Sequence, residues 1–599
     1  MRKALSIFVA SLMFIIAVLA VTFAVPPKVA YAQEGVAHTR QEFFDALARK
    51  TSVVLVDDID FEGASINLNY DVYIKANGQN ATLKNVYFNI AAPIVAPSSI
   101  SITLENLTLD GGVDYSAYSF AEGKSFEDTF GDTRDSFRAI NGEQGYFDLS
   151  LKGVKITRYA SELGAALYVP NVHRDAPKSV YIENSTFENN ISLQDVVHLS
   201  NDRLSVTIKN SEFASNYAYK SAGFSIANCI IDIDGANVHD NHFLPYDVNK
   251  NNLQLAGGGV FICGVNGSMR NSQIVGNHTV YGGGIAVSPK TTGSGEIILE
   301  NVLIASNSAT YGGGICAYSI SGQPITFVGC KFFNNSATYG SSLYSVNYAH
   351  WVATNNGGVV EFLFCTFAEN TASDKDSFRF YLADATKGEL GFVSLKGCFV
   401  IGEDTYGSQP NDYNYIATRA QALSDYVVTE DMLASCIQNG LVPQKGSVAD
   451  VKVPANVYSK WLDIFKDAKS DATIGAMPAE IPAKQVWVIP VAVVASVVGA
   501  ALIALAVIVI VKKLRKEKAP VIIQPQDSHE PDERAKRIGT LTERELKVAQ
   551  MIVGLKKRQE IANELNYSEN TIKKDLSSIY QKLAVDGKSS LIALYKDLL

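Results

Sequence analysis

Two lysines and several hydroxyl side chains near the C-terminus have the residue types and the spacing to bind a polyanion. Thr571, Lys573, Lys574 and Ser577 lie in a stretch whose apolar residues recur every three or four positions. A helix would therefore place these polar side chains opposite its buried stripe. Ammonium and hydroxyl groups on one exposed face can contact phosphate oxygens and base edges of a nucleic acid. The plain alternative is a solvated helix face.

The distribution of charge supports a polyanionic partner for this end of the chain only. The 599 residues carry a net charge of −9. From Lys512 to the end there are 18 Lys/Arg against 13 Asp/Glu, whereas the remainder has 34 against 48. An acidic large part and a basic tail suit two different environments.

Three helices are expected to position these side chains. Thr542 and Glu545 form a capping-box pattern at the start of the first helix, which ends at Gly554. The second helix is expected at 557–565, and after a three-residue turn the third spans 569–583, capped by Ser568. Helix, short turn and helix at this size is the arrangement that reads DNA.

Residues 540–595 resemble the LuxR/GerE-type helix-turn-helix domain. The matching motifs are Leu541-Thr542-Glu543-Arg544-Glu545, Gln559-Glu560-Ile561-Ala562 with Leu565, Ser568-Glu569 with Thr571-Ile572-Lys573, and Tyr580 with Lys582-Leu583 and Val585. The resemblance implies an all-α four-helix domain that binds double-stranded DNA. Carried over by position, it implies that Thr571, Lys573, Lys574 and Ser577 face DNA, and that Ser568, Thr571 and Lys582 contact phosphate.

Two features of this domain bear on its affinity for DNA. The family usually has histidine where this chain has Asp575, and a carboxylate near phosphate repels it unless a lysine neutralises the charge. From Thr540 onward there are 10 Lys/Arg against 8 Asp/Glu, which indicates modest affinity. The resemblance implies a homodimer through the last helix, 589–599, whose apolar residues would be partly interface and partly core.

No catalytic, metal or cofactor site is predicted. The early acids Asp57, Asp58, Asp60, Asp110, Asp114, Asp132 and Asp135, with Arg134, do not recur on one face, and solvated loop acids explain them. The eight histidines include no His-x-x-x-His pair on an expected helix. Tyrosines and asparagines could form a glycan- or protein-binding face or could be structural ladders.

A repeat of about 30 residues occupies the middle of the chain. An apolar residue recurs three positions before an asparagine, in the pairs Phe187/Asn190, Phe213/Asn216, Val238/Asn241, Ile274/Asn277, Ile304/Asn307, Phe332/Asn335 and Phe367/Asn370. Glycine clusters follow several pairs, as at 282–284 and 312–314.

Such a repeat predicts a right-handed parallel β-helix, in which each coil buries its apolar side chains by stacking on the next. Asparagine suits the corner because it tolerates the left-handed conformation and can bond the equivalent amide one coil away. The pattern resembles the repeats of chlamydial polymorphic outer-membrane proteins and, more loosely, pectate-lyase-like β-helices. A sandwich is the alternative fold. Residues 39–50 are expected to form a helix that plugs the open end, followed by a strand at 52–61.

The seven cysteines show no metal-ligand spacing. Cys330 and Cys365 each stand two positions before a ladder phenylalanine, so they are expected as inward neighbours on successive coils. Buried thiols are the favoured interpretation and a disulfide is the alternative.

Two apolar segments and their flanks complete the predicted order of domains. Residues 1–32 read as a signal peptide, with an uncleaved anchor as the alternative, and 486–511 is an uncharged stretch long enough to cross a bilayer. Lysines and arginine after it favour the cytoplasmic side. The expected parts are an exterior β-helix at 33–415, a cap and stalk at 416–485, the transmembrane helix at 486–511, a tether at 512–539 and the DNA-binding domain at 540–599. Within the cap, helices are expected at 416–424, 430–437 and 457–468.

These parts together predict a single-pass cell-membrane protein that regulates transcription. The exterior β-helix would sense an unidentified glycan or protein, and the cytoplasmic domain would bind promoter DNA without a cofactor. A surface adhesin or glycan-binding protein with a vestigial inner domain, and a glycan-active enzyme, are the alternatives from other classes.

Overall fold

The computed structural model describes residues 34–475 and 537–595, apart from 51, 79, 93–98, 114–137, 171–177, 245–256, 289–295, 320–324, 348–359, 375–377, 383–392, 403–412, 469, 555, 557, 566, 584, 586–590 and 592–594. The chain forms two units, of which the second begins at Ile489. The expected signal peptide, the membrane segment and residues 512–536 of the tether lie outside the described residues. In the part of the chain that is described, no helix is long and apolar enough to cross a membrane.

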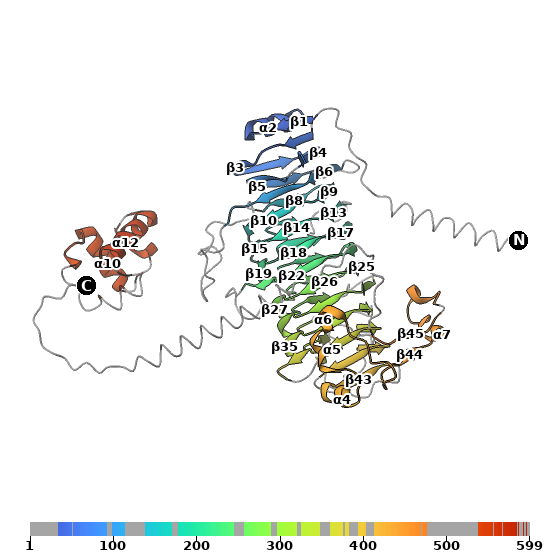
Figure 1. The fold of residues 1–599 in the computed structure, drawn as a ribbon. Helices are drawn as coiled ribbons and strands as arrows, with labels where there is room; N and C mark the ends of the chain where they lie inside the picture. Colours follow the sequence, from blue (N-terminus) through green and yellow to red (C-terminus); the bar gives the residue numbers. More distant parts are fainter. Residues whose placement is uncertain are drawn as a thin grey trace, which may run out of the picture. The chain divides into compact units, whose positions relative to one another are not determined.

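The first unit is a stack of β-coils with three faces, as Figure 1 shows from the blue to the yellow end of the stack. Every strand pairing in the coils is parallel, which confirms the β-helix and excludes the sandwich. The first face consists of β1 (Glu34–Ala37), β2 (Ser52–Leu55), β4 (Val72–Ala76), β6 (Ile100–Glu105), β9 (Phe147–Lys152), β13 (Lys178–Glu183), β17 (Leu204–Lys209), β21 (Ile230–Asp234), β25 (Asn266–Arg270), β29 (Ile297–Glu300), β33 (Ile325–Val328), β37 (Val360–Leu363) and β41 (Val393–Lys396).

The second and third faces share the long strands β3 (Ile59–Leu68) and β5 (Ala81–Ala91) in the early coils. The second face continues with β7 (Leu107–Asp110), β10 (Lys155–Thr157), β14 (Thr186–Glu188), β18 (Glu212–Ala214), β22 (Asn237–His239), β26 (Gln273–Val275), β30 (Leu303–Ala305), β34 (Lys331–Phe333), β38 (Thr366–Ala368), β42 (Phe399–Gly402) and β43 (Tyr415–Thr418). The third face continues with β8 (Ile140–Gln144), β12 (Leu167–Val169), β16 (Val197–Ser200), β20 (Phe224–Ala227), β24 (Val260–Cys263), β28 (Ile285–Ser288), β32 (Ile315–Ser319), β36 (Leu343–Asn347) and β40 (Phe378–Leu382).

Two small sheets lie at the corner between these faces. One consists of β11 (Ala160–Ser161), β15 (Ile191–Ser192), β19 (Tyr217–Ala218) and β23 (His242–Phe243), and the other of β27 (His278–Tyr281), β31 (Ser308–Tyr311), β35 (Ser336–Tyr339) and β39 (Thr371–Ala372).

The predicted apolar ladder is confirmed. Phe187, Phe213, Val238, Ile274, Ile304, Phe332 and Phe367 pair one after another in register and are fully buried or nearly so. The Phe187 and Phe213 rings stack with centroids 4.8 Å apart, and the Phe332 and Phe367 rings with centroids 4.5 Å apart. Stacking buries side chains that a single coil would leave exposed.

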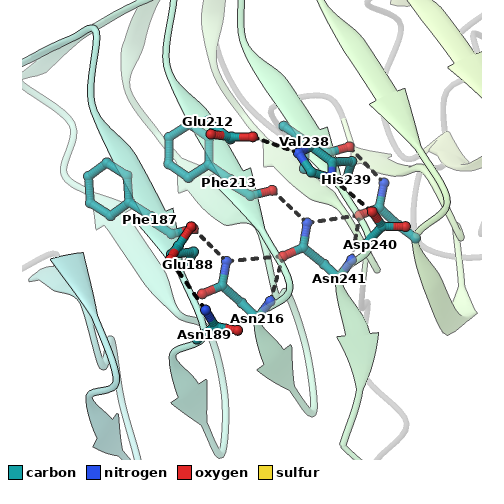
Figure 2. A network of polar contacts seen from close by, with 11 residues as sticks. Phe187, Glu188, Asn189, Glu212, Phe213, Asn216, Val238, His239, Asp240 and Asn241 are labelled. Carbon is teal, nitrogen blue, oxygen red and sulfur yellow. Dashed lines mark hydrogen bonds and ion pairs between the residues drawn. The ribbon is translucent and has the colours of Figure 1, made fainter. Parts of the chain in front are cut away.

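The asparagine ladder is also confirmed, with one correction. Figure 2 shows Asn216 and Asn241 in this row, where Nδ2 of Asn216 donates to Oδ1 of Asn241 at 3.0 Å and to the carbonyl of Phe187 at 2.9 Å. The ladder asparagines do not have the left-handed conformation expected for them. The residue before each one has it, as at Asn189 and Asp240, with φ of 54° and 51°. The ladder asparagine itself points inward, where its amide bonds the next coil.

The glycine clusters allow close approach between coils. Gly282 has a φ of +64°, and a Cβ on Gly283 would lie 2.5 Å from the carbonyl oxygen of Gly313 in the next coil. Side chains at these corners would force the coils apart.

The expectation of buried thiols in place of disulfides is confirmed: none of the seven cysteines, all of which lie in the described ranges, forms a disulfide, and all but Cys263 are buried. Cys330 and Cys365 are buried neighbours in one row, and Cys398, which was not predicted to join them, extends the row by one coil. The Cys365 thiol donates to the carbonyl of Phe327 at 3.4 Å. Burial raises the pKa of Cys365, so the thiol is a packed, neutral group.

The first coil is covered by the expected helix, α2 (Arg40–Ala48), which Thr39 and Glu42 cap as a capping box. Phe43 packs edge-on against Phe61 with centroids 5.0 Å apart. The expected strand at 52–61 is wrong as a single element, because the chain turns a corner between β2 and β3. Within α2, Phe43, Ala46 and Leu47 are buried, whereas Ala48 is exposed.

The segment after the last coil packs on outward side chains of the coils, over Phe333, Leu363 and Phe364. The expected helix at 416–424 begins only at Arg419, since the residues before it form β43 and continue the second face. The helices are α4 (Arg419–Ser424), α5 (Glu430–Ala434), α6 (Cys436–Asn439) and α7 (Ala455–Tyr458), with a 3-10 turn at Asp463–Phe465 and the antiparallel pair β44 (Lys452–Val453) and β45 (Ala472–Thr473). The single helix expected at 457–468 is therefore wrong.

The second unit contains α10 (Glu543–Val553), α11 (Arg558–Leu565) and α12 (Glu569–Leu583), as predicted. Its separate core includes Val548, Ile552, Ile561, Ile572 and Ile579. The fourth helix is described only at Leu591 and Tyr595.

Candidate nucleic-acid interface

Helix α12 presents one buried stripe and one exposed face. Ile572, Leu576, Ile579 and Leu583 recur at intervals of four, three and four residues and are buried in the core of the unit. Lys573, Lys574 and Ser577, the predicted DNA-facing residues, are all exposed. The apolar periodicity therefore positions the polar side chains on the solvent side of the helix.

The start of α12 is fixed by two hydroxyl groups. The Ser568 Oγ accepts from the backbone N–H of Thr571 at 3.2 Å and lies 2.8 Å from the Thr571 Oγ1. Ser568 is exposed and Thr571 is half-buried. A helix N-terminus with uncommitted N–H groups attracts phosphate, so this end of α12 suits the phosphate contacts that the resemblance implies.

Lys573 and Lys574 are the exposed lysines of the solvent face of α12. Among the described residues neither has an ion-pair partner, whereas Lys556 is paired with Glu564. Two exposed ammonium groups on one helix face can approach phosphate oxygens.

Lys582 has an ion-pair partner within the domain. Its Nζ is 2.6 Å from Oε2 of Glu545, a buried carboxylate that also accepts from the Ser578 hydroxyl at 2.6 Å. Burial would raise the pKa of Glu545, but hydrogen bonds from Lys582, Ser578 and Thr542 outweigh it and hold the pKa at about 2. Glu545 was predicted only as a capping residue, and it also joins α10 to α12. The role of Lys582 toward phosphate stays a prediction.

Asp575 does not stand among the exposed residues. Its side chain is 8% exposed and pairs with Arg544, whose Nη2 is 2.6 Å from Oδ1 of Asp575. The sequence led us to expect that Asp575 would repel phosphate. The structure corrects this expectation, because Arg544 of the same domain pairs with the Asp575 carboxylate. The helical period would have placed Asp575 inward, three residues after Ile572 and four before Ile579.

The described part of the last helix belongs to the core. Leu591 and Tyr595 are buried, and the Tyr595 hydroxyl donates to the carbonyl of Leu583 at 2.8 Å. The other apolar residues of 589–599 lie outside the described residues, so dimerisation through this helix stays a prediction.

In the first unit, His239 is a charged structural group. Its Nε2 is 2.8 Å from Glu212 and its Nδ1 is 2.9 Å from Asp240, as Figure 2 shows. Burial disfavours the charged imidazole, but the bonds to Asp240 and Glu212 outweigh it and raise the pKa of His239 to about 9. An imidazole with both nitrogens engaged and a proton held this tightly is a poor general base.

A second polar cluster lies on outward positions of the third face. Tyr168 and His198 pair in register, with ring centroids 5.3 Å apart, and the buried guanidinium of Arg138 lies 4.0 Å over the Tyr168 ring. The Nδ1 of His198 is 2.9 Å from the buried carboxylate of Asp195. A carboxylate that orients one imidazole nitrogen leaves proton transfer to the other, so this cluster has the chemistry of an acid–base site.

The early acids have local structural partners. Asp57 pairs with His38, Asp60 accepts from the Asn85 side chain, and Asp110 pairs with Arg158. Asp114, Asp132, Arg134 and Asp135 lie outside the described residues. Within the described ranges no group of His, Cys, Asp and Glu side chains has the arrangement of a metal site.

Comparison with known proteins assigns the second unit. Residues 539–595 match the family described as "Bacterial regulatory proteins, luxR family". This segment is therefore a LuxR-type DNA-binding domain. The match covers about a tenth of the chain and describes this domain alone.

Solved structures similar to the first unit are remote. The periplasmic alginate epimerase AlgG is 10% identical, with 60% of this chain and 83% of that chain covered and a TM-score of 0.23. The Azotobacter vinelandii mannuronan C-5 epimerase AlgE6 A-module is 13% identical, with 61% and 96% covered and a TM-score of 0.25. No curated protein matches the chain. At these scores the likeness supports no inference about substrate.

Proposed function

We propose that this protein is a membrane-tethered one-component transcriptional regulator. The LuxR-type domain binds promoter DNA in the cytoplasm, and the β-helix on the other side of the membrane senses a glycan or protein ligand. The observation that carries the proposal is that Lys573 and Lys574 are exposed on α12 of a LuxR-type domain.

The membrane arrangement is supported by the sequence alone. An uncharged stretch at 486–511 separates the β-helix from the DNA-binding domain, and basic residues follow it directly. Protease protection in sealed vesicles tests the orientation. The β-helix and the DNA-binding domain are expected on opposite sides of the bilayer, and digestion of both from one side would contradict the proposal.

DNA binding is tested with the domain itself, because it has its own core. Purified residues 535–599 are expected to shift fragments of a genomic DNA pool. DNA affinity falls as salt rises, and each phosphate contact contributes about one to the magnitude of the slope of log affinity against log salt. Lys573→Ala with Lys574→Ala is expected to reduce that magnitude by about two.

The matched control is Lys547→Ala with Lys556→Ala. It removes two positive charges away from α12, one from α10 and one from the segment that follows α10. This control is expected to weaken binding less than the α12 pair does. No shift of any DNA by the intact domain would remove the basis of the proposed function.

A glycan-active β-helix is the second candidate, and the Arg138–Tyr168–His198–Asp195 cluster favours it. In this case the full chain would turn over a member of a panel of neutral and acidic polysaccharides. His198→Ala would abolish turnover, while His278→Ala, further along the β-helix, would preserve it. If no polysaccharide of the panel is turned over, this second candidate is contradicted and the proposed role of the β-helix as a sensor stands.

A further inference from the structure

One flank of α12 is occupied by the first turn of α10. Thr571, Asp575, Ser578 and Lys582 follow one another at intervals of four, three and four residues, so they form a line beside the buried stripe. Asp575 bonds Arg544, and Ser578 and Lys582 bond Glu545, each at 2.6 Å. Two consecutive residues of α10 therefore account for three of the four side chains on this flank.

The Arg544–Asp575 pair is asymmetric in its exposure. The Asp575 side chain is 8% exposed, while the Arg544 side chain is 48% exposed. One oxygen of Asp575 accepts from the guanidinium, and the other, Oδ2, is buried and has no hydrogen-bond partner among the described residues. A buried carboxylate with an unbonded oxygen costs free energy, so stability alone is a poor explanation for the pair.

What the pair does achieve is to hold the guanidinium in one place. Arg544 lies over the Tyr567 ring, 5.4 Å from the centroid, and Tyr567 directly precedes the capping residue Ser568. Arg544 is thus held between the turn that precedes α12, at Tyr567, and the second turn of α12, at Asp575. The resemblance implies phosphate contacts at Ser568 and Thr571.

A guanidinium so placed keeps donors for a second anion. It has five N–H donors in a planar fork, of which Nη2 is directed at Asp575. Arginine can bridge a protein carboxylate and a phosphate because its charge is permanent and its fork matches both groups.

We propose that Arg544 is a further phosphate-contacting residue of the DNA interface and that Asp575 is the positioning residue that orients it. Lys582, by contrast, belongs to the internal network with Glu545. This inference rests on the proposed DNA binding and concerns which cations carry it.

The test measures binding of a fluorescent mixed-sequence DNA duplex to the full-length chain in detergent, by anisotropy over a range of salt from about 50 to 200 mM. Arg544→Met is expected to lower the salt slope by about one and to weaken binding roughly threefold to tenfold. Arg544→Lys should keep most of the slope and still bind more weakly, because the charge stays and the fork is lost. Lys547→Met, which removes an exposed charge of α10, should leave the slope unchanged.

Asp575→Asn distinguishes two roles of Asp575, which are to orient Arg544 and to neutralise its charge, because they change the DNA affinity in opposite directions. If Asp575 orients Arg544, the variant binds DNA more weakly than the wild type. If Asp575 only cancels the charge of Arg544, the variant binds more tightly, and the proposal is overturned. An unchanged slope and affinity for Arg544→Met would also overturn it.

The measurements on the wild type and on Arg544→Met distinguish failure of the proposed function from failure of this inference. A wild-type chain that binds no DNA contradicts the proposed function, whereas wild-type binding that Arg544→Met leaves intact contradicts this inference alone. Because the slope is measured on the bound complex, partial loss of folded protein lowers the apparent affinity without changing the slope.

Discussion

At Lys178 a charged side chain stands where the neighbouring coils have apolar ones. It pairs in register with Leu204 on one side and faces the Phe147 ring on the other, and it is 3% exposed. Its Nζ lies 5.2 Å from the Phe147 ring centroid and has no hydrogen-bond partner among the described residues. Burial lowers the pKa of Lys178 to about 8, with Glu143 opposing the shift.

Lys178→Met should therefore stabilise the β-helix at neutral pH, by about 1–3 kcal/mol. Below pH 8 the native chain buries a charged ammonium. Between pH 8 and about 10.5 the unfolded state binds the proton and the native state does not, so wild-type stability rises with pH. At pH 7 the urea midpoint of the variant should be higher than that of the wild type. At pH 10 the two midpoints should lie close together. Equal midpoints at pH 7 would contradict the buried charge.

At the scale of the strand and its corner, the asparagine ladder is a chain of buried amides. Asn241 Oδ1 accepts from the backbone and side-chain nitrogens of Asn216 at 3.1 and 3.0 Å. Its Nδ2 donates to Asn277 and to the carbonyl of Phe213. Each amide satisfies groups on both neighbouring coils, so coils are joined at the corner as well as by strand pairing.

Asn241→Ala should lower the free energy of unfolding by about 2–4 kcal/mol, because it leaves donors of Asn216 and the carbonyl of Phe213 buried without partners. Asn237→Ala, at an outward position of β22 just before this corner, is the matched control and should cost less than about 0.5 kcal/mol. Chemical denaturation of both variants checks the difference. Similar losses for the two would mean that the ladder contributes no more than a surface amide.

The repeat could be predicted because the coils align the same residue types at one period. The apolar ladder and the asparagine ladder therefore appear in the sequence as pairs three residues apart. The left-handed residue could not be assigned from composition, since Asn189 and Asn190 are adjacent and only the corner geometry separates their roles. The strands of the third face could not be predicted one by one, because their outward residues do not repeat in type. The outward row changes from polar residues such as His198 and Ser225 to small and aromatic ones such as Ala286 and Tyr344.

The helices of the DNA-binding unit could be predicted almost to their ends, since capping residues and apolar spacing are local signals. The partners of Asp575 and Lys582 could not, because Arg544 and Glu545 lie more than thirty positions away. Long-range ion pairs leave no spacing pattern in a single sequence.

At the scale of the whole β-helix, one outward row of the first face alternates in charge over eight coils. The row is Lys75, Glu105, Lys152, Glu183, Lys209, Asp234, Arg270 and Glu300, each paired in register with the next. All eight are half-buried. A coil inserted or skipped in the stack would bring like charges together, so the row favours one order of coils.

Glu183→Lys would place three lysines on consecutive strands, at 152, 183 and 209. The free energy of unfolding should fall by about 1 kcal/mol, and the loss should shrink as salt screens the repulsion. Glu183→Gln removes the attraction without adding repulsion and should cost about half as much. Thermal or urea midpoints at low and high salt make the comparison. A salt-independent loss would point to packing and not to charge.

The central claim is that the LuxR-type domain of this chain binds DNA at promoters through α12. Genome-wide mapping of DNA crosslinked to the full-length protein, compared with the Lys573→Ala, Lys574→Ala variant at equal abundance, tests it most directly. We expect discrete enrichment at a set of promoters that the variant loses. An identical profile for the two proteins, or no enrichment above background for the wild type, would contradict it.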